Sequence, residues 1–583
     1  MIREEITMAR NYKEEYQHWL DSPALSEEEW AELNAIADDE KEIENRFFAP
    51  LEFGTAGLRG TMKLGLHHMN VHIIRHATQA FANVISAEGE EAKRKGIAIA
   101  YDCRLNGETF AREAACVMAA NGVHVRIFDA LRPTPELSFA VLYYGTIAGL
   151  NVTASHNPKE YNGYKVYWAD GAQLPPQKAD AIARQMEAID IFTGFKTCDF
   201  DEAVKSGRIE ILGKETDDAF MEQVMAQAID KEVVKEVADE FKVVYTPFHG
   251  CGYKLVPEAL ARLGLKYVYP VEEQMVIDGS FPTVASPNPE NPEGFYLAVD
   301  LAKKVGSDLI IGTDPDSDRI GTMVRVGDEY KTITGNQMGV LLLDYIIRAK
   351  KSTGTLPENA GALSSIVSTG MARAVCEANG VHFEDTFTGF KFMAERIAEW
   401  EAAESYKYIF AFEESYGYMV GDYVRDKDAV TASMLVAEMA ASYHKQGMTL
   451  MDAVNALYEK YGHFAEKTLN LVMPGLDGLQ KMQQLMKELR EKPPVEIGGQ
   501  EVLRIRDYAD GSIFVAGLGK VGKTPFWGSN VLYFELADGS SFIVRPSGTE
   551  PKIKVYLLVR GESQAQCAEK IARYNEFADS LKK

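Results

Sequence analysis

The sequence has no uninterrupted hydrophobic run long enough to cross a membrane. Its longest weakly polar stretch, Leu137 to Leu150, is shorter than the about 18 to 20 apolar residues that a spanning helix needs. The N-terminal segment, which begins MIREEITMARNYKEEYQHWL, mixes both charges with apolar positions. This pattern favours an amphipathic helix over a signal peptide. We therefore predict a cytoplasmic protein without a membrane partner.

Cysteine and positive charge are also scarce. The 6 cysteines include no C-x-x-C pair, which argues against a disulfide framework or a zinc site and favours reduced thiols. The 62 Lys and Arg residues are outnumbered by 86 Asp and Glu residues, and the formal net charge is −24. Such a balance argues against a general nucleic-acid binder. Any anionic ligand must therefore be held by local positive groups.

The chain of 583 residues, 46% hydrophobic and 25% charged, is too long for a single core and suggests about four domains at roughly 150 residues each. From about residue 70, apolar runs of strand length alternate with helical patterns, as in KGIAIAYD, FKVVYTP and SDLIIGTD. This alternation predicts α/β units with mixed, mainly parallel sheets. We place domain boundaries at 1–210, 211–330, 331–448 and 449–583.

The two ends of the chain differ from this pattern. The opening fifty residues predict an acidic helical cap, with Ser26 before three Glu as a helix N-terminus. Beyond about Met448, closely spaced strands and a D-G turn predict a smaller α+β domain with an antiparallel sheet. One helix over Glu562 to Lys582 closes the chain.

Three predicted strands run directly into polar loops, at Ser155, Asp314 and Glu413. Ligands of α/β sheets bind beyond the carboxyl ends of the strands. Three such loops from three α/β units are expected to face one central cleft.

The first loop, T-A-S-H-N-P, places Ser155 beside His156 and ten residues before Lys165. Its residues are common in turns, and they also suit a serine nucleophile with a neighbouring base. The loop alone does not separate these two interpretations.

The second loop, T-D-P-D-S-D-R, places Asp314, Asp316 and Asp318 at alternate positions. Three carboxylates so close repel one another unless a cation lies between them. An EF-hand is excluded because Arg319 and Arg325 stand where that loop needs Gly and Glu. Ligands that offer only oxygen favour a hard ion, most simply Mg²⁺ carrying a phosphate oxygen.

Two further loops carry groups suited to a sugar phosphate. Glu413, Glu414 and Ser415 can hydrogen-bond sugar hydroxyls, although a Glu-rich helix start would look the same. Arg545 with a Ser, a Thr, a Gly amide and a Lys can hold a phosphate monoester, although an ordinary hairpin is the alternative. Two shorter Gly-containing loops carry a cation each, Arg59 in one and Lys391 after Thr388 and Gly389 in the other.

In this order, the motifs T-A-S-H-N-P, T-D-P-D-S-D-R, E-E-S-Y-G and R-P-S-G-T-E-P-K resemble those of the α-D-phosphohexomutase (phosphoglucomutase/phosphomannomutase) family. The resemblance spans about Phe53 to Val559. The family's sugar loop commonly has Gly where this chain has Phe412. That departure and the T-G-F-K loop resemble the longer branch of bacterial α-phosphoglucomutases and phosphopentomutase-like enzymes.

The resemblance implies a role for each loop residue. It implies that Ser155 carries a phosphoryl group, with Arg59, His156 and Lys165 in the catalytic site and Lys165 as an acid/base. It implies that Ser155, Asp314, Asp316 and Asp318 surround Mg²⁺. The implied substrate-binding residues are Arg319, Thr388, Gly389, Lys391, Glu413, Ser415, Arg545, Ser547, Gly548 and Thr549. The four domains would then supply the phosphoserine, the metal, the sugar site and the phosphate site in turn.

The resulting expectation is an isomerase that interconverts α-D-glucose 1-phosphate and glucose 6-phosphate through glucose 1,6-bisphosphate. We expect a monomer or dimer whose only partner is a small sugar phosphate. Mannose and pentose phosphates remain alternative substrates on the same scaffold. Two remoter hypotheses are a phosphatase with Asp314 as nucleophile and a sugar-phosphate sensor without catalysis.

Overall fold

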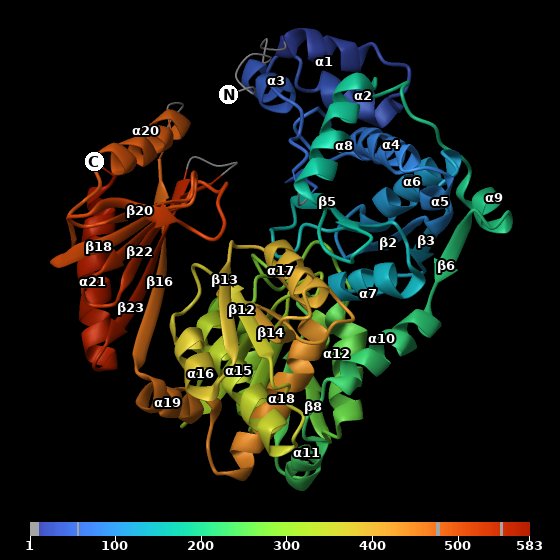
Figure 1. Ribbon diagram of the computed structural model, residues 1–583. Helices are drawn as coiled ribbons and strands as arrows, with labels where there is room; N and C mark the ends of the chain where they lie inside the picture. Colours follow the sequence, from blue (N-terminus) through green and yellow to red (C-terminus); the bar gives the residue numbers. More distant parts are fainter. Residues whose placement is uncertain (1–10, 55–56, 474–477, 548–551, 583) are drawn as a thin grey trace. The chain divides into compact units, whose positions relative to one another are not determined.

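The computed structural model describes residues 11–54, 57–473, 478–547 and 552–582. The chain forms two compact units (Figure 1). The first unit contains the chain up to Thr334 together with Ile397–Glu399 and Tyr416–Thr449. The second contains Gly335–Arg396, Trp400–Ser415 and Leu450–Lys583. Within the described ranges, no helix is both long and apolar enough to span a membrane.

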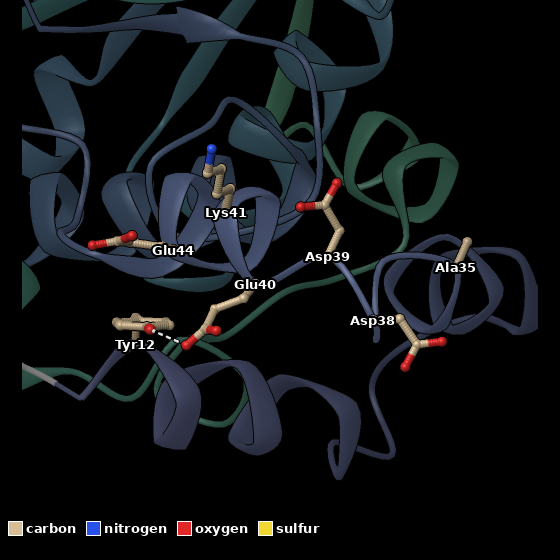
Figure 2. A pocket seen from close by; sticks show the side chains of 7 residues that line it. All are labelled: Tyr12, Ala35, Asp38, Asp39, Glu40, Lys41 and Glu44. Carbon is tan, nitrogen blue, oxygen red and sulfur yellow. Dashed lines mark hydrogen bonds between the residues drawn. The ribbon is translucent and has the colours of Figure 1, made fainter.

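The first unit opens with the predicted helical cap, formed by α1 (Tyr12–Leu20), α2 (Glu27–Asn34) and α3 (Glu40–Phe47). Ser26 caps α2 as expected, because its side chain accepts the backbone N–H of Glu29 while the Glu29 carboxylate accepts that of Ser26. The Tyr12 hydroxyl donates to Glu40 at 2.9 Å and so ties α1 to α3, in a surface pocket lined largely by carboxylates (Figure 2).

A six-stranded sheet follows, with strand order β1-β5-β4-β2-β3-β6. Strands β4, β2, β3 and β6 are parallel to one another, whereas β5 is antiparallel to both of its neighbours, β4 and β1. Both faces are covered: Ile97 and Ile99 pack beneath α4, α6 and α8, and Ala98 and Ala100 pack against α7. The strands are β1 (Leu58–Thr61), β2 (Ile97–Tyr101), β3 (Val125–Phe128), β4 (Ala148–Val152), β5 (Tyr161–Trp168) and β6 (Ile209–Leu212), and the helices are α4 (Val71–Ala87), α5 (Glu90–Lys95), α6 (Gly107–Ala120), α7 (Thr134–Tyr144), α8 (Pro176–Ala188) and α9 (Phe200–Lys205).

The second sheet of this unit has five strands in the order β11-β10-β9-β7-β8. Strands β9, β7 and β8 are parallel, and the hairpin β10-β11 extends the sheet in antiparallel fashion. Its strands are β7 (Lys242–Thr246), β8 (Tyr267–Pro270), β9 (Leu309–Thr313), β10 (Ile320–Val326) and β11 (Glu329–Ile333), and the surrounding elements are α10 (Lys214–Ala226), α11 (Lys231–Val237), α12 (Gly252–Leu263), α13 (Glu272–Met275), η1 (Pro292–Phe295), α14 (Tyr296–Val305) and α18 (Ala429–Lys445). Strand β15 (Gly417–Met419) comes before α18 in the chain and is not part of this sheet.

The second unit begins with the third α/β layer, in which β12 lies between β13 and β14 and all three strands are parallel. Phe412, the departure from the common sugar loop, is fully buried and packs on α15. A Cβ at Gly339 would lie 2.2 Å from its ring, so the glycine makes room for it. The elements are α15 (Gly335–Ser352), β12 (Ala360–Ser365), α16 (Met371–Asn379), β13 (His382–Thr386), α17 (Phe390–Ala402), β14 (Lys407–Glu413) and α19 (Leu450–Tyr461).

The chain ends with an antiparallel sheet in the order β16-β23-β22-β21-β18-β19-β20, with β17 paired to β18. Helices α20 and α21 flank it, and α21 covers β16 and β23. The predicted closing helix is confirmed, and Ser563 caps its start. The elements are β16 (His463–Val472), α20 (Gly478–Glu491), β17 (Glu496–Ile497), β18 (Gln500–Asp507), β19 (Ser512–Val515), β20 (Gly519–Lys523), β21 (Leu532–Leu536), β22 (Ser541–Pro546), β23 (Lys552–Gly561) and α21 (Gln564–Ser580).

The predicted fold class is thus confirmed: three α/β layers with mixed, mainly parallel sheets precede a smaller antiparallel α+β domain. The antiparallel pairs of the mixed sheets lie at their edges, in β1-β5 and β10-β11. The four domain boundaries and the central cleft stay predictions.

Candidate active site

Ser155 lies three residues beyond the end of β4, in a loop that holds an unusual backbone conformation. Its φ is +51°, a left-handed value that costs a non-glycine residue on the order of 1–3 kcal/mol. Its N–H donates to the Thr153 hydroxyl at 2.8 Å, and that hydroxyl donates to Asp102 at 2.6 Å. The loop therefore presents Ser155 in a conformation that its neighbours enforce.

Arg104 holds the same loop through hydrogen bonds to its backbone. Its guanidinium donates to the carbonyl oxygens of Ser155 at 2.6 Å and Pro158 at 2.9 Å, and also to those of Asn157 and Tyr161. The side chain is fully buried and lies 3.4 Å from the Asp102 carboxylate. A planar guanidinium suits this task because it offers five donors in a fixed fork.

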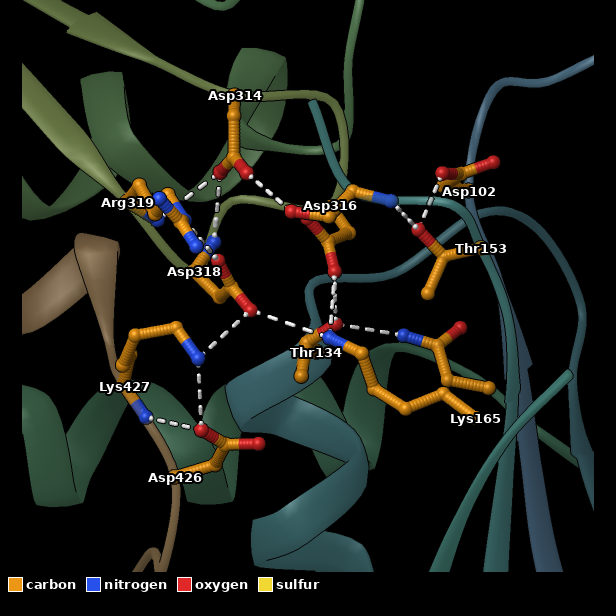
Figure 3. Close-up of polar contacts among 12 residues, drawn as sticks. Asp102, Thr134, Thr153, Lys165, Asp314, Asp316, Asp318, Arg319, Asp426 and Lys427 are labelled. Atoms are coloured by element: carbon orange, nitrogen blue, oxygen red, sulfur yellow. Dashed lines mark hydrogen bonds and ion pairs between the residues drawn. The ribbon is translucent and has the colours of Figure 1, made fainter. Parts of the chain in front are cut away.

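The three aspartates of the second loop follow β9, and all are buried (Figure 3). One carboxylate oxygen from each lies within 4.8 Å of the others. Asp314 accepts the backbone N–H groups of Asp318 and Arg319 on Oδ1, at 3.0 and 2.9 Å. On Oδ2 it accepts the Ser155 hydroxyl at 2.9 Å. The predicted nucleophile and the predicted metal loop are therefore in direct contact.

The donor set of this loop fits a divalent cation. Among the residues that the structure describes, Asp316 Oδ1, Asp318 Oδ1 and Ser317 Oγ are buried but have no hydrogen-bond partner. Buried oxygens without partners are costly. Burial and the two neighbouring carboxylates raise the pKa of Asp314 well above its ordinary value. A hard cation bound by these oxygens would remove both penalties.

Two buried lysines face the acidic loop (Figure 3). Lys165 Nζ lies 3.1 Å from both Asp316 Oδ2 and Asp318 Oδ2. Lys427 Nζ lies 3.3 Å from Asp318 and 3.0 Å from Asp426. Burial alone would lower the pKa of Lys165, but Asp316, Asp318 and Asp426 raise it above the ordinary lysine value. The same cations hold the pKa of Asp318 well below its ordinary value against the effect of burial.

The remaining predicted residues of this unit surround Ser155. His156 Nδ1 lies 3.1 Å from Ser155 Oγ, and burial together with Arg319 and Arg59 lowers the pKa of His156 well below its ordinary value. Arg59, on the edge strand β1, donates to Asn157 at 3.2 Å. Arg319 pairs with Glu290 at 2.8 Å. The structure thus gathers Arg59, Ser155, His156, Lys165, Asp314, Asp316, Asp318 and Arg319 in one site.

The predicted sugar loop lies in the second unit, where β14 ends. The Glu413 carboxylate accepts the backbone N–H of Gly389, so the E-E-S-Y-G and T-G-F-K loops meet. Glu414 instead turns toward β12 and accepts the hydroxyls of Ser365 at 3.0 Å and Ser368 at 3.3 Å. Thr388, Lys391 and Ser415 are all partly exposed around these contacts.

The predicted phosphate loop begins at the end of β22. Arg545 hydrogen-bonds Tyr556, whose pKa is raised to about 12, mainly by burial and by Glu414. Ser547 donates its N–H to the carbonyl of Lys552 at 2.9 Å. The predicted residues Gly548 and Thr549 lie outside the described residues. Tyr556 is thus influenced both by Arg545 and by the two glutamates of the sugar loop.

Sequence reasoning missed Lys427, Asp426, Arg104 and Thr134. Lys427 and Asp426 stand in a polar stretch between β15 and α18. β15 has only three residues, so it gives no clear strand pattern that would mark them. Arg104 lies in the loop after β2, and Thr134 begins α7 after β3. β2 pairs with β4, the strand that leads to Ser155, and β3 pairs with β2. The ends of β2 and β3 were the features of the sequence that could have identified Arg104 and Thr134.

Known families and proteins resemble this chain over most of its length. Four phosphoglucomutase/phosphomannomutase family models match in order: alpha/beta/alpha domain I at residues 50–191, domain II at 218–327, domain III at 334–461 and the C-terminal domain at 470–573. A phosphoglucomutase of Staphylococcus saprophyticus is 34% identical over 527 residues, which covers 90% of this chain and 93% of the relative. One of Staphylococcus aureus is 36% identical and covers 91% and 93%.

Two solved structures share the fold. The open form of the phosphoprotein pp63/parafusin, a phosphoglucomutase of Paramecium, has a TM-score of 0.67 at 19% identity and covers 91% of this chain and 95% of its own. A phosphoglucomutase/phosphomannomutase family protein of Burkholderia thailandensis has a TM-score of 0.64 at 17% identity, covering 91% and 97%. With four domain models in order and relatives matched over nearly their whole length, the chain belongs to the phosphoglucomutase/phosphomannomutase family.

Proposed function

We propose that this chain is an intramolecular phosphotransferase that interconverts α-D-glucose 1-phosphate and glucose 6-phosphate. A phosphoryl group carried on Ser155 passes to the free hydroxyl of the sugar, which becomes glucose 1,6-bisphosphate. Ser155 then takes the other phosphoryl group back. In each half-reaction one P–O bond to Ser155 Oγ breaks or forms as one P–O bond to the sugar forms or breaks.

A single observation carries this proposal: the hydroxyl of Ser155 donates to Asp314 at 2.9 Å, inside a cluster of buried carboxylates and lysines. A serine used only for a turn has no need of this environment. A phosphoryl group on Oγ would face the oxygens that fit a cation, and Lys165 and Lys427 stand beside them. Positive groups placed in advance around a transferring phosphoryl group are the main source of catalysis in such reactions.

Ser155, Asp314, Asp316 and Asp318 would hold Mg²⁺, and when bound this ion neutralises charge on the transferred group. The chain's own residues do the rest. Each transfer moves one proton from the hydroxyl that receives the phosphoryl group to the oxygen that loses it. Lys165, held as an ammonium by its neighbours, supplies positive charge and can pass this proton on as an acid/base. The neutral His156 ring, 3.1 Å from Oγ, contacts the nucleophile and helps to orient it.

The second unit supplies the substrate site in this proposal. Glu413 and Ser415 accept and donate hydrogen bonds to sugar hydroxyls, beside Thr388, Gly389 and Lys391. Arg545 and Ser547, with Gly548 and Thr549, bind the phosphate that is not being transferred. Arg319 of the first unit is also a proposed substrate-binding residue. A guanidinium can hold phosphate oxygens in pairs.

Replacement of the proposed nucleophile tests the function directly. With purified protein and glucose 1,6-bisphosphate present, Ser155→Ala is expected to lose mutase activity by about 10⁴-fold or more. It is also expected to lack the mass of one phosphoryl group in intact-mass spectra. Ser206→Ala, at an exposed serine of the same unit, is the matched control and should retain both. Full activity of Ser155→Ala would refute the mechanism.

Other substrates and reactions make different predictions. A phosphomannomutase or phosphopentomutase would show its highest kcat/KM with mannose or ribose 1-phosphate, so a comparison of these with glucose 1-phosphate decides the sugar. A phosphatase with Asp314 as nucleophile would release inorganic phosphate, but both oxygens of Asp314 already accept hydrogen bonds. A sensor would bind sugar phosphate without interconverting it.

Three further predictions complete the proposal. We propose a cytoplasmic location, a monomer or dimer, and a small sugar phosphate as the only partner. We keep the domain boundaries at 1–210, 211–330, 331–448 and 449–583, for the phosphoserine, metal, sugar and phosphate domains.

A further inference from the structure

Thr134 is the first residue of α7 and is fully buried between the helix and the acidic loop. Its backbone N–H donates to the carbonyl of Asp316 at 2.8 Å. Its hydroxyl donates to Asp316 Oδ2 at 2.7 Å (Figure 3). One residue therefore binds both the backbone and the side chain of the middle aspartate.

The direction of the hydroxyl bond follows from a second contact. Asn151, on the strand that leads to Ser155, donates its Nδ2 to Thr134 Oγ1 at 2.7 Å. A threonine hydroxyl has one proton and accepts on its other side. Because Asn151 fills an accepting position, the proton of Thr134 is free to point at Asp316. The two hydrogen bonds therefore run in one direction: Asn151 donates to Thr134, and Thr134 donates to Asp316.

The two carboxylate oxygens of Asp316 differ in their hydrogen bonding. Oδ2 accepts from Thr134 and from Lys165, at 2.7 and 3.1 Å. Oδ1 is buried and has no hydrogen-bond partner in the part of the chain that the structure describes. Rotation of the carboxylate would break both bonds to Oδ2 and would turn Oδ1 away. Oδ1 is thereby kept available as a ligand atom.

We infer that Thr134 is a positioning residue of the cation site: it fixes the Asp316 carboxylate so that Oδ1 faces the ion. This inference rests on the proposed function, because it assumes that Asp316 is a ligand. Groups that hydrogen-bond a metal-ligating carboxylate commonly change metal affinity by about 10- to 100-fold when they are removed. Thr134 would act on affinity through Asp316, without touching the ion or the substrate.

The test measures Mn²⁺ binding to the full chain, stripped of metal with EDTA and then dialysed, by the loss of the free-ion signal in electron paramagnetic resonance. Thr134→Val keeps the branched shape but lacks the hydroxyl, and Thr134→Ser keeps the hydroxyl. We expect Thr134→Val to bind Mn²⁺ about 10- to 100-fold more weakly and Thr134→Ser to bind within a few-fold of the wild type. Asp316→Asn, which removes the ligand charge, should bind more weakly still.

A second readout separates positioning from a structural defect. Thermal unfolding in EDTA should be similar for the wild type and both Thr134 variants. If Thr134→Val does not fold, the smaller Thr134→Ala carries the same test. In steady-state assays, Thr134→Val should need a higher Mg²⁺ concentration for half-activation but recover most of kcat at saturation.

The outcomes distinguish the inference from the function on which it rests. Equal Mn²⁺ affinity of the wild type and Thr134→Val, with weaker binding by Asp316→Asn, would overturn the role of Thr134 alone. Equal binding by the wild type and Asp316→Asn would overturn the cation site, and the inference with it. Weak binding by Thr134→Ser as well as Thr134→Val would also overturn the inference, because the hydroxyl would then not be the cause.

Discussion

At the scale of single residues, the conformation of Ser155, the proposed nucleophile, depends on the buried side chains around its loop. Ser155 keeps a left-handed backbone only because its neighbours compensate for the strain. Thr153 and Arg104 supply that compensation, and Asp102 joins them. Burial raises the pKa of Asp102 to about 6, although Arg104 and Thr153 oppose this. Such a carboxylate is charged at neutral pH only while its cation stays in place.

We therefore predict that Arg104→Met will lose at least about 100-fold in kcat, because a loop that positions a reacting group tolerates little displacement. It should also destabilise the first unit by about 3–5 kcal/mol, the usual effect of leaving one buried charge unpaired. Differential scanning calorimetry and steady-state kinetics measure the two losses. Arg112→Met, at an exposed arginine on α6, is the control.

The double variant Arg104→Met/Asp102→Asn separates the two effects. It should regain part of the stability, since no buried charge is left without its partner, but little of the activity. Recovery of both would mean that the four carbonyl contacts of Arg104 do not position Ser155.

A second prediction concerns His68, which is buried beside the helical cap. Its Nδ1 contacts the Thr61 hydroxyl at 2.8 Å, and its Nε2 has no partner among the described residues. Burial, followed by the charges of His67, Arg46 and Lys63, lowers the pKa of His68 to about 4. The unfolded chain, with a histidine pKa of about 6.5, binds this proton more readily. Stability from this group is thus full above pH 6.5 and falls as the pH drops toward 4.

Between pH 7.5 and pH 5, this single histidine should remove about 2 kcal/mol from the first unit. His68→Gln keeps a polar side chain near Thr61 but does not titrate. The Tm of the wild type should therefore fall more steeply over this range than that of His68→Gln. His18, exposed on α1, gives the control His18→Gln. Parallel Tm curves for wild type and His68→Gln would contradict the assignment.

At the scale of elements, the acidic cap is held to the first sheet by an aromatic anchor. Trp19 is fully buried, and its ring lies 5.7 Å from Phe47, 5.6 Å from His72 and 5.1 Å from Phe192. Removing such a side chain costs about 3–5 kcal/mol through lost burial and the cavity that remains. The cap is thus predicted to be part of the folded first unit rather than an appendage.

Trp19→Ala should accordingly lower the Tm of the first unit and expose the cap to limited proteolysis. Trp30→Ala removes a tryptophan that is 48% exposed on α2 and should leave both properties unchanged. Because neither ring contacts the site, kcat at 25 °C should be similar for both variants. Equal proteolysis of the two variants would show that Trp19 is no anchor.

Local patterns were enough to predict the elements that carry the site. Apolar runs of strand length marked β4, β9 and β14, and the polar residues beyond them include Ser155 and Asp314. The helix start at Ser26 and the closing helix could likewise be predicted from neighbouring residues. These features depend on interactions within a few positions along the chain, where sequence patterns are informative.

The contacts that depend on tertiary packing could not be predicted from the sequence. Asp426 accepts from Tyr167 at 2.8 Å and from Gln173 at 3.1 Å, residues that no spacing connects with it. Lys427 reaches Asp318 only because α18 packs against β9 and β10. In the same way, Thr134 looks like part of an ordinary Pro-rich turn until its contact with Asp316 is seen. Distances along the chain say little about such pairs.

At the scale of the whole molecule, the chain is acidic, so the cations at its sites matter for binding an anionic substrate. The net charge of −24 would repel a sugar phosphate if it were spread evenly over the surface. Local cations oppose this repulsion at the described sites: Lys165 and Lys427 in the first unit, and Arg545 in the second. The proposed work is divided accordingly, with chemistry in the first unit and retention of the substrate in the second.

This division predicts that damage to the second unit spares the chemistry of the first. Arg545→Ala should raise KM for glucose 1-phosphate by about 10- to 100-fold, because hydrogen bonds to a charged group contribute about 1.5–3 kcal/mol. The fraction of protein that carries a phosphoryl group on Ser155, measured by intact mass, should stay at the wild-type level. Glucose 1,6-bisphosphate, held by one cation fewer, should leave the enzyme more often per turnover, which isotope exchange with free bisphosphate would detect.

Arg560→Ala, at an exposed arginine of β23 in the same sheet, should match the wild type in all three measurements. An unchanged KM in Arg545→Ala would remove the guanidinium from the substrate site, whereas loss of the phosphoryl group from Ser155 would show that the two units do not divide the work.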